Sequence, residues 1–192
     1  PGMVIHTHSL RVMKARRTVL ELILSDHPKD CLICQKNGRC ELQSLAARLG
    51  IREIPVVENA AMSTYKKDAS PSFNRDMDKC VMCRRCETMC NDVQTVGALS
   101  AVNRGFMAVV APAFEQKLID SSCTFCGQCV AVCPTGALTE VDHTNKIIQA
   151  LTDPTKTVVV QTAPAVRAAL GEEFGMKPGT LVTGKLASAL RR

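Results

Sequence analysis

The chain has 192 residues, 46% hydrophobic and 22% charged, a balance that argues against disorder, and no apolar run approaches the ~18 residues of a transmembrane helix. The net charge of +6 comes with only 3% aromatic residues and no interleaved stacking aromatics, which argues against a nucleic-acid binder. Eleven cysteines are an odd number, so disulfides alone do not account for them, and metal ligands that cross-link a small core are favoured.

The first part of the chain is predicted to be helical. Residues 9–24 carry apolar side chains at helical spacing behind Ser9, a suitable N-cap. A loop with three cysteines follows, and a second short helix is expected over 41–49, with Gly50 as its stop. Residues 59–79, rich in Ser, Lys, Asp and Pro, are interpreted as a linker.

Residues 80–141 contain an internal repeat. The segment CVMCRRCETMC followed by GALSAV is matched downstream by CTFCGQCVAVC followed by GALTEV. The first copy has four more residues between its last cysteine and GAL, and Asn91 stands where the second copy has Pro134. The two copies are therefore one unit used twice, with a different exit turn.

Each copy has its cysteines in the spacing C-x2-C-x2-C-x3-C, which is typical of two-cluster bacterial ferredoxins. In that pattern three cysteines hold one [4Fe-4S] cluster and the fourth binds the other cluster. This rule assigns one cluster to Cys80, Cys83, Cys86 and Cys133, and the other to Cys123, Cys126, Cys129 and Cys90. A structural zinc site has no use for a third cysteine so close in sequence, and such closely spaced thiols cannot easily all form disulfides.

The remaining three cysteines follow a histidine in the pattern H-x3-C-x2-C-x5-C. A histidine just past a helix end is by itself more often a cap to the helix dipole. A third cubane needs four ligands, however, and only one histidine is positioned to supply the last of them. The count favours a third [4Fe-4S] cluster on His27, Cys31, Cys34 and Cys40.

After residue 142 the cysteines stop and the pattern becomes that of an α/β unit. A helix is expected over 145–151, a buried strand over 157–161, and a helix that begins at Pro164 and ends near Phe174. A last helix should begin near Leu181.

These motifs resemble the [FeFe]-hydrogenases, especially the large subunits of multi-subunit, NAD(P)-linked or electron-bifurcating enzymes. The resemblance rests on DHPKDCLICQKNGRCELQ, on the two ferredoxin motifs and on VVVQTAPAVRAALGEEFG. It implies an α+β fold with these parts: the tail of a [2Fe-2S] domain at 1–8, a helical [4Fe-4S] domain at 9–58, the linker, a ferredoxin-like domain at 80–142, and the start of the catalytic domain at 143–192.

The resemblance also implies an oxidoreductase that interconverts protons and dihydrogen. In such an enzyme this chain would be the electron relay, and Ala163 and Pro164 would approach the pocket of an H-cluster whose cysteine ligands lie outside the sequence. An N-terminal [2Fe-2S] cluster, NAD(P)H- and flavin-type partner subunits or ferredoxin, a hetero-oligomer and a cytoplasmic location are expected as well. The alternatives are the relay of a formate dehydrogenase or complex I-type subunit, and a non-catalytic hydrogenase-like iron-sulfur protein.

Overall fold

The computed structural model describes residues 2–54 and 68–192. The chain divides into two compact units, one that ends at Val141 and one that comprises Asp142–Arg192. All eleven cysteines belong to the first unit.

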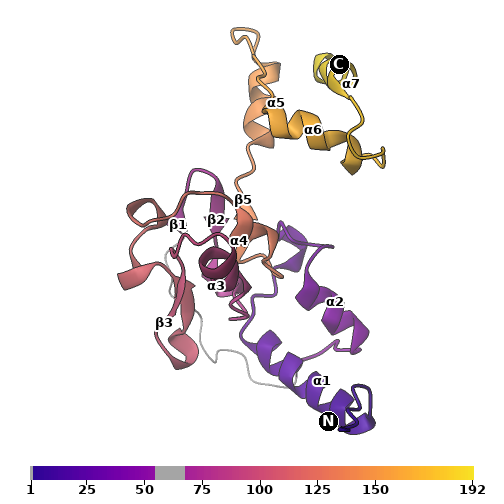
Figure 1. Ribbon diagram of the computed structural model, residues 1–192, viewed down its shortest axis with the longest axis vertical. Helices are drawn as coiled ribbons and strands as arrows, with labels where there is room; N and C mark the ends of the chain where they lie inside the picture. Colours follow the sequence, from indigo (N-terminus) through magenta and orange to yellow (C-terminus); the bar gives the residue numbers. More distant parts are fainter. Residues whose placement is uncertain (1, 55–67) are drawn as a thin grey trace. The chain divides into compact units, whose positions relative to one another are not determined.

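Two helices form the N-terminal part of the first unit (Figure 1). Helix α1 comprises Leu10–Ser25, and the Ser9 hydroxyl accepts a hydrogen bond from the backbone N–H of Val12 at 3.4 Å. Helix α2 comprises Glu41–Arg48 and ends before Gly50, whose φ of +63° is a conformation that favours glycine. The predicted helices, the N-cap and the glycine stop are confirmed.

The cysteine repeat is built on two small antiparallel sheets. One has the strand order β1-β2-β5, the other β3-β4. The strands are β1 Asp68–Ala69, β2 Phe73–Arg75, β3 Ser100–Val102, β4 Val109–Ala111 and β5 Leu138–Glu140.

The pairing of the strands ties the two repeats to each other. Strand β2 precedes the first cysteine loop and pairs with β5, which follows the second, in the register Asn74 opposite Thr139. Strand β3 follows the first loop and pairs with β4, which precedes the second. The core between the sheets contains Phe73, Leu118 and Val130. Each half of the repeat is therefore closed by the other.

The linker predicted over 59–79 is wrong for residues 68–79. This stretch contains β1 and β2, and Phe73 is only 2% exposed in the core. The Ser, Lys, Asp and Pro residues of this stretch suggested a linker, although it contains a strand. Phe73, the apolar residue of that strand, packs against the second cysteine loop, where its ring lies 6.2 Å from that of Phe125. Residues 59–67 of the prediction lie outside the described part of the chain.

The loops and short helices between the strands carry most of the cysteines. Helix α3 (Arg85–Thr88) runs directly into a π-helical turn, Met89–Val93, and helix α4 comprises Gln128–Ala131. Short 3₁₀ turns comprise Cys31–Ile33, Met77–Lys79, Gly105–Met107, Ala113–Glu115 and Leu118–Asp120. The π-helix thus contains Cys90 and extends into the longer segment between this cysteine and Gly97, and π-helices are frequent at functional sites.

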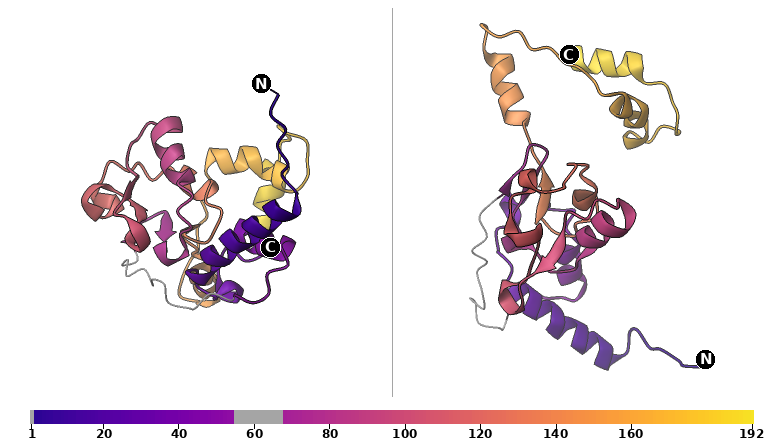
Figure 2. Two further views of the ribbon diagram at one scale, coloured as in Figure 1. Left: turned by 90° about the horizontal axis from the view of Figure 1, so that it is seen from below. Right: turned by 60° about the vertical axis from the view of Figure 1, so that its left-hand side comes forward.

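The second unit contains three helices, which are seen from two sides in Figure 2. They are α5 Thr144–Thr152, α6 Pro164–Glu173 and α7 Thr183–Arg191. The helices expected near 145, at Pro164 and near 181 are confirmed. The strand predicted over 157–161 is wrong for this structure: the segment has no regular secondary structure, and Val159 is 84% exposed. A strand needs a neighbour for its backbone groups, and the described residues of this unit include no second strand.

Among the described helices, none is long and apolar enough to cross a lipid bilayer.

Candidate metal centres

All eleven cysteines are free thiols. Cys129 and Cys133 are buried, and Cys31, Cys83 and Cys126 are exposed. No disulfide therefore competes with a role for these residues as metal ligands.

The two cysteine loops have the same backbone conformation. Two positions of each loop are left-handed: Met82 and Arg84 in the first, with φ of 51° and 60°, and Phe125 and Gly127 in the second, with φ of 55° and 74°. In each loop the first of these residues donates its backbone N–H to a cysteine sulfur, Met82 to Cys80 and Phe125 to Cys123, both at 3.4 Å. Such N–H···S bonds stabilise thiolates in iron-sulfur proteins and tune the potentials of their clusters.

Cys133, from the second repeat, lies among the cysteines of the first. It lines one cavity together with the first three cysteines of that repeat, beside Arg75 and Thr135. Burial, reinforced by the neighbouring Cys80 and Cys133 thiols, raises the pKa of Cys86 to about 12. Burial also raises the pKa of Cys80, and Cys133 adds to this rise.

The reciprocal arrangement holds for Cys90. Burial raises the pKa of Cys129 to about 11, and the Cys123, Cys126 and Cys90 thiols add to the effect. The pKa of Cys123 is raised by burial too, with Cys90 its foremost thiol neighbour. The structure thus brings together two groups of four thiols, each with one member from the other repeat.

These thiol groups fit a multinuclear iron cluster chemically. Several thiolates in one buried place repel one another, so they become stable together only when a cationic centre compensates their charge. Within the described residues no three His, Cys, Asp or Glu side chains are close enough to hold one single ion. A single zinc ion holds sulfur at about 2.3 Å, whereas a cubane carries each thiolate on a different iron, so its ligands stand farther apart.

The third group lies between α1 and α2. Cys31 and Cys34 belong to one 3₁₀ turn, closed by a bond from the Cys34 N–H to the Cys31 carbonyl at 3.3 Å. His27 and Cys40 stand at the two ends of this loop. The backbone N–H of His27 donates to the Leu24 carbonyl at 3.3 Å, and Cys40 is the N-cap of α2.

His27 has the features expected of a neutral ligand. Its Nδ1 atom is buried and has no hydrogen-bond partner within the described part of the chain. Burial lowers its pKa, although the charge of Asp30 acts in the opposite direction. The imidazole is therefore neutral near pH 7, which is the form that binds iron.

The third group is held against the ferredoxin-like part by several contacts. The Glu41 N–H donates to the Pro134 carbonyl at 2.9 Å, and the Glu41 carboxylate accepts two hydrogen bonds from Arg85 at 2.7 and 2.9 Å. The Cys34 sulfur lies so close to Gly136 that a Cβ atom there would be 2.6 Å from it. A glycine at this position thus lets a candidate cluster ligand approach the turn after Cys133.

Two cations near the thiols, buried Arg75 and partly buried Lys79, were not predicted from the sequence. Arg75 is 8% exposed, donates to the Val110 carbonyl at 2.7 Å, and lowers the pKa of both Cys80 and Cys123, although burial raises them more. Lys79 forms ion pairs with Asp30 and Asp76. Both precede the first loop closely in sequence, and that position is the one signal that could have drawn attention to them.

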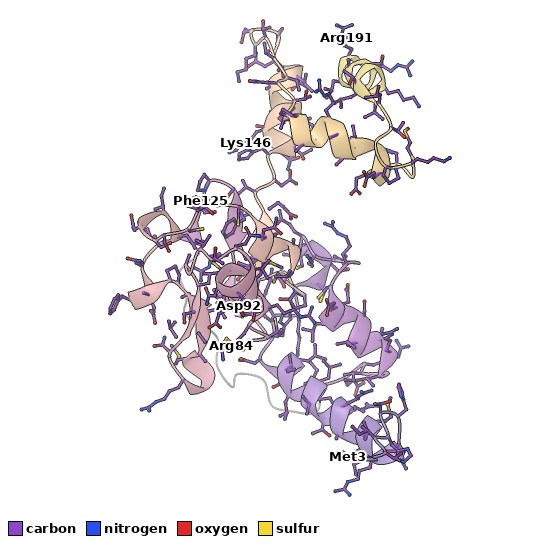
Figure 3. The ribbon with its side chains drawn as sticks, in the orientation of Figure 1. Met3, Arg84, Asp92, Phe125, Lys146 and Arg191 are labelled. Atoms are coloured by element: carbon purple, nitrogen blue, oxygen red, sulfur yellow. The ribbon has the colours of Figure 1, made fainter. Side chains whose placement is uncertain are left out.

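Arg84 and Phe125, the left-handed residues labelled in Figure 3, come from the two loops and lie on either side of α3 in that view. Ala163 and Pro164, which the resemblance places near the pocket of an H-cluster, belong to the second unit. Ala163 is the N-cap of α6 and Pro164 its first residue, and both are exposed.

Three known protein families match successive parts of the chain. Residues 16–55 match the NADH-ubiquinone oxidoreductase-G iron-sulfur binding region, and residues 70–139 match the ferredoxin-like domain of NADH-quinone oxidoreductase subunit 3. Residues 156–192 match the C-terminal domain of the iron-only hydrogenase large subunit. The first two families correspond to the candidate centres, so the chain contains iron-sulfur binding domains.

One solved structure extends the comparison to the fold. A chain of the NAD⁺-reducing [NiFe]-hydrogenase in the H₂-reduced state matches 73% of this chain and 59% of its own length, with a TM-score of 0.65 and 27% identity. An NADH-quinone oxidoreductase subunit of Rhizobium meliloti is 37% identical over 71% of this chain and 16% of its own length.

Two relatives match over the whole chain. The NADP-reducing hydrogenase subunit HndD of Solidesulfovibrio fructosivorans is 68% identical over 100% of this chain and 32% of its own length. Iron hydrogenase 1 of Clostridium pasteurianum is 32% identical over 100% of this chain and 33% of its own length. The chain thus spans about a third of each of these two relatives. With both matches running through the cysteine repeats into the hydrogenase-specific residues 156–192, the chain belongs to the family of iron-only hydrogenase large subunits.

Proposed function

We propose that the chain carries electrons through three [4Fe-4S] clusters. When bound, each cluster supplies a one-electron redox centre, and the residues of the chain hold, separate and tune these centres. The proposed ligand sets are His27, Cys31, Cys34 and Cys40 for cluster 1, Cys80, Cys83, Cys86 and Cys133 for cluster 2, and Cys123, Cys126, Cys129 and Cys90 for cluster 3.

The observation that supports the proposal most strongly is the exchange of the fourth cysteines. Cys133 lines a cavity with the first three cysteines of the other repeat, and Cys90 has Cys123 and Cys129 as neighbours. A duplicated zinc site or a set of disulfides has no need of this exchange, whereas two-cluster ferredoxins depend on it.

In the complete enzyme the relay would connect a redox partner with a hydrogen-activating site, where protons and dihydrogen are interconverted. NAD(P)H- and flavin-type subunits of a hetero-oligomer, or ferredoxin, would exchange electrons with the relay in the cytoplasm. An H-cluster and an N-terminal [2Fe-2S] cluster would belong to other parts of that enzyme. The exposed turn at Ala163 and Pro164 is available to face the H-cluster pocket once the remainder of the catalytic domain packs on it.

Iron and sulfide analysis of the purified chain tests the number of clusters. Three cubanes require about twelve iron and about twelve acid-labile sulfide per chain. Two or three zinc ions with no sulfide would overturn the proposal, and about eight irons would leave the two-cluster part standing without cluster 1.

A labelling experiment tests the role of His27. In protein grown with ¹⁵N-histidine and reduced, pulsed EPR should detect a ¹⁵N coupling in the signal of one cluster. A His27→Cys variant should lose this coupling and lower the midpoint potential of that cluster, because an anionic thiolate makes the reduced state more costly than a neutral imidazole does. His143→Cys, a substitution of an exposed histidine outside the cysteine-bearing unit, is the control. If His27→Cys leaves every midpoint unchanged, His27 is not a ligand.

The second candidate function is the relay of a complex I-type subunit. It is favoured by the two NADH oxidoreductase families that match 16–55 and 70–139. The match of residues 156–192 to the hydrogenase C-terminal domain gives the first candidate its advantage. Hydrogen uptake or evolution by the complete enzyme, measured with a dye as electron acceptor or donor, separates the two.

A further inference from the structure

Lys79 is a cation with little access to water, placed among carboxylates and cysteines. Its side chain is 12% exposed, and its Nζ atom lies 3.0 Å from Asp30 and 3.3 Å from Asp76. Asp30 precedes Cys31 of the proposed cluster 1, and Lys79 itself precedes Cys80 of the proposed cluster 2. One ammonium group thus connects the two ligand loops.

The backbone of Lys79 is fixed as firmly as its side chain. Its carbonyl accepts a hydrogen bond from the Thr135 hydroxyl at 2.7 Å, and its N–H donates to the Asp76 carbonyl at 3.1 Å. Thr135 is 1% exposed, and its Oγ1 lies 3.9 Å from the Cys133 sulfur. Lys79 is therefore anchored to the turn that carries a proposed ligand of cluster 2.

Gly136 shows how close Lys79 comes to cluster 1. A Cβ at Gly136 would lie 2.6 Å from the Cys34 sulfur and 3.4 Å from the Cδ atom of Lys79, so both pack against the same glycine. The ammonium is thus near a proposed ligand of cluster 1, on a side chain that comes from the ferredoxin-like part.

The lysine carries its charge at neutral pH. Its ammonium is paired with the carboxylates of Asp30 and Asp76, and the ordinary pKa of a lysine lies far above 7. Its side chain is only 12% exposed, so solvent screens its charge less than that of an exposed lysine.

We propose that Lys79 is a positioning and potential-setting residue for cluster 1: it holds the His27–Cys40 loop against the ferredoxin-like part and favours the reduced state of the cluster there. This inference rests on the ligand sets proposed above. The reduced cluster has one more negative charge than the oxidised one, so a nearby fixed cation raises its midpoint potential and a nearby carboxylate lowers it.

The test measures the three midpoint potentials in the iron-loaded full-length protein by EPR-monitored titration, with the ¹⁵N-histidine coupling to identify cluster 1. In Lys79→Met, the ratio of reduced to oxidised cluster 1 at a fixed potential should fall about tenfold, a shift of about 59 mV for one electron. Cluster 2 should shift less, and cluster 3 least. Lys79→Arg should stay within about twofold of the unmodified protein, because it retains the charge.

Asp30→Asn should shift the midpoint potential of cluster 1 in the opposite direction, and it provides a second test in case Lys79→Met loses iron. It leaves Lys79 with one carboxylate fewer, so the midpoint of cluster 1 should rise. If Lys79→Met fails to retain about twelve irons, Asp30→Asn and Lys79→Arg decide the matter. The proposal is overturned if the midpoint potential of cluster 1 does not rise in Asp30→Asn. It is also overturned if that potential falls in Lys79→Arg by as much as is expected for Lys79→Met.

Lys156→Met is the matched control. Lys156 pairs with Asp153 at i,i+3, as Lys79 does with Asp76, but it belongs to the unit without cysteines. It should leave all midpoints unchanged, and an equal shift in this control would overturn the specific role of Lys79. If Lys79→Met has a normal iron content and unchanged midpoint potentials, the inference about Lys79 is wrong but the proposed function stands. If the unmodified protein contains no iron and no sulfide, the proposed function itself is wrong.

Discussion

The two cysteine repeats have loops of the same backbone conformation but different surroundings. Both loops place left-handed residues at the same two positions and form the same N–H···S bond. Around its last cysteine, the first copy forms a π-helical turn at Met89–Val93. The second copy instead continues from its last cysteine into Pro134, whose carbonyl accepts a hydrogen bond from the first residue of α2. The duplicated part is thus the part suited to holding iron, and the copies differ where each meets its neighbours.

The first repeat reaches the loop of the proposed cluster 1 through Arg85, which pairs with Glu41, and the second repeat reaches it through its exit turn. That exit turn, Pro134 to Gly136, contacts the loop of the proposed cluster 1 through Glu41 and Cys34. The equivalent turn of the first repeat is closed by its own backbone hydrogen bonds, in which the Cys90 carbonyl accepts from the N–H groups of Val96 and Gly97. The exit turn of the second repeat thus adds to the contacts that Arg85 and Lys79 make with the loop of the proposed cluster 1.

The largest expected effect comes from breaking the exchange between the repeats. Cys133→Ala should remove about four of about twelve irons, and so should Cys83→Ala. Since both are proposed ligands of one cluster, the double variant should lose no more than either single one. Combining Cys83→Ala with Cys90→Ala should instead remove about eight irons. Iron analysis with EPR spin counting measures all four variants.

The same variants contain their own control. If each fourth cysteine served the loop of its own repeat, the two double variants would change places: Cys83 with Cys90 would lose about four irons, and Cys83 with Cys133 about eight. That result would overturn the exchanged ligand sets while leaving the number of clusters intact.

A smaller effect is expected from the glycines of the two GAL segments. Gly136→Ala places a Cβ 2.6 Å from the Cys34 sulfur, so the cluster 1 loop must move, and we expect loss of the ¹⁵N-coupled signal and of up to about four irons. The matched variant Gly97→Ala meets no atom within 4 Å and adds only the strain of a φ of +68°. It should retain all its iron and destabilise the fold by about 1–2 kcal/mol.

Iron content and the urea midpoint of unfolding separate the two glycine variants. Equal iron in both would show that the Cys34 contact does not position cluster 1. A larger iron loss in Gly97→Ala would reverse the expected order and assign the third centre to the other repeat.

How far the sequence predicts this molecule depends on whether the signal is local. Ser9, Gly50 and Pro164 predict where helices begin or end, because capping acts within a few residues. The cysteine spacing likewise predicts which residues could share a cluster. The four extra residues of the first repeat indicate a different turn, but nothing in them specifies a π-helix.

Long-range contacts account for what could not be predicted. The strand at Phe73–Arg75 exists because β5, more than sixty residues later, pairs with it, as its register opposite Leu138–Glu140 shows. The run 157–161 has strand propensity but forms no strand, since the described residues of its unit offer no strand to pair with it. Lys79 and Gly136 gain their significance from Asp30 and Cys34, which lie across the fold and follow no spacing rule.

The smallest expected effect concerns the second left-handed position of each loop. A Cβ added at Gly127 would meet no atom within 4 Å, and φ there is +74°. Gly127→Ala should therefore lower the unfolding free energy by about 1–2 kcal/mol through backbone strain alone. Arg84→Gly removes the same kind of strain from the first loop, where φ is 60°. It also removes the ion pair of Arg84 with Glu87, at 2.7 Å, and because the Arg84 side chain is 59% exposed, solvent screening leaves that pair little weight. The urea midpoint should therefore fall in Gly127→Ala and rise slightly in Arg84→Gly, where the greater conformational entropy that glycine loses on folding offsets part of the strain relieved. A fall of the same size in Arg84→Gly would mean that the arginine holds its loop through Glu87 and that the two loops are stabilised differently.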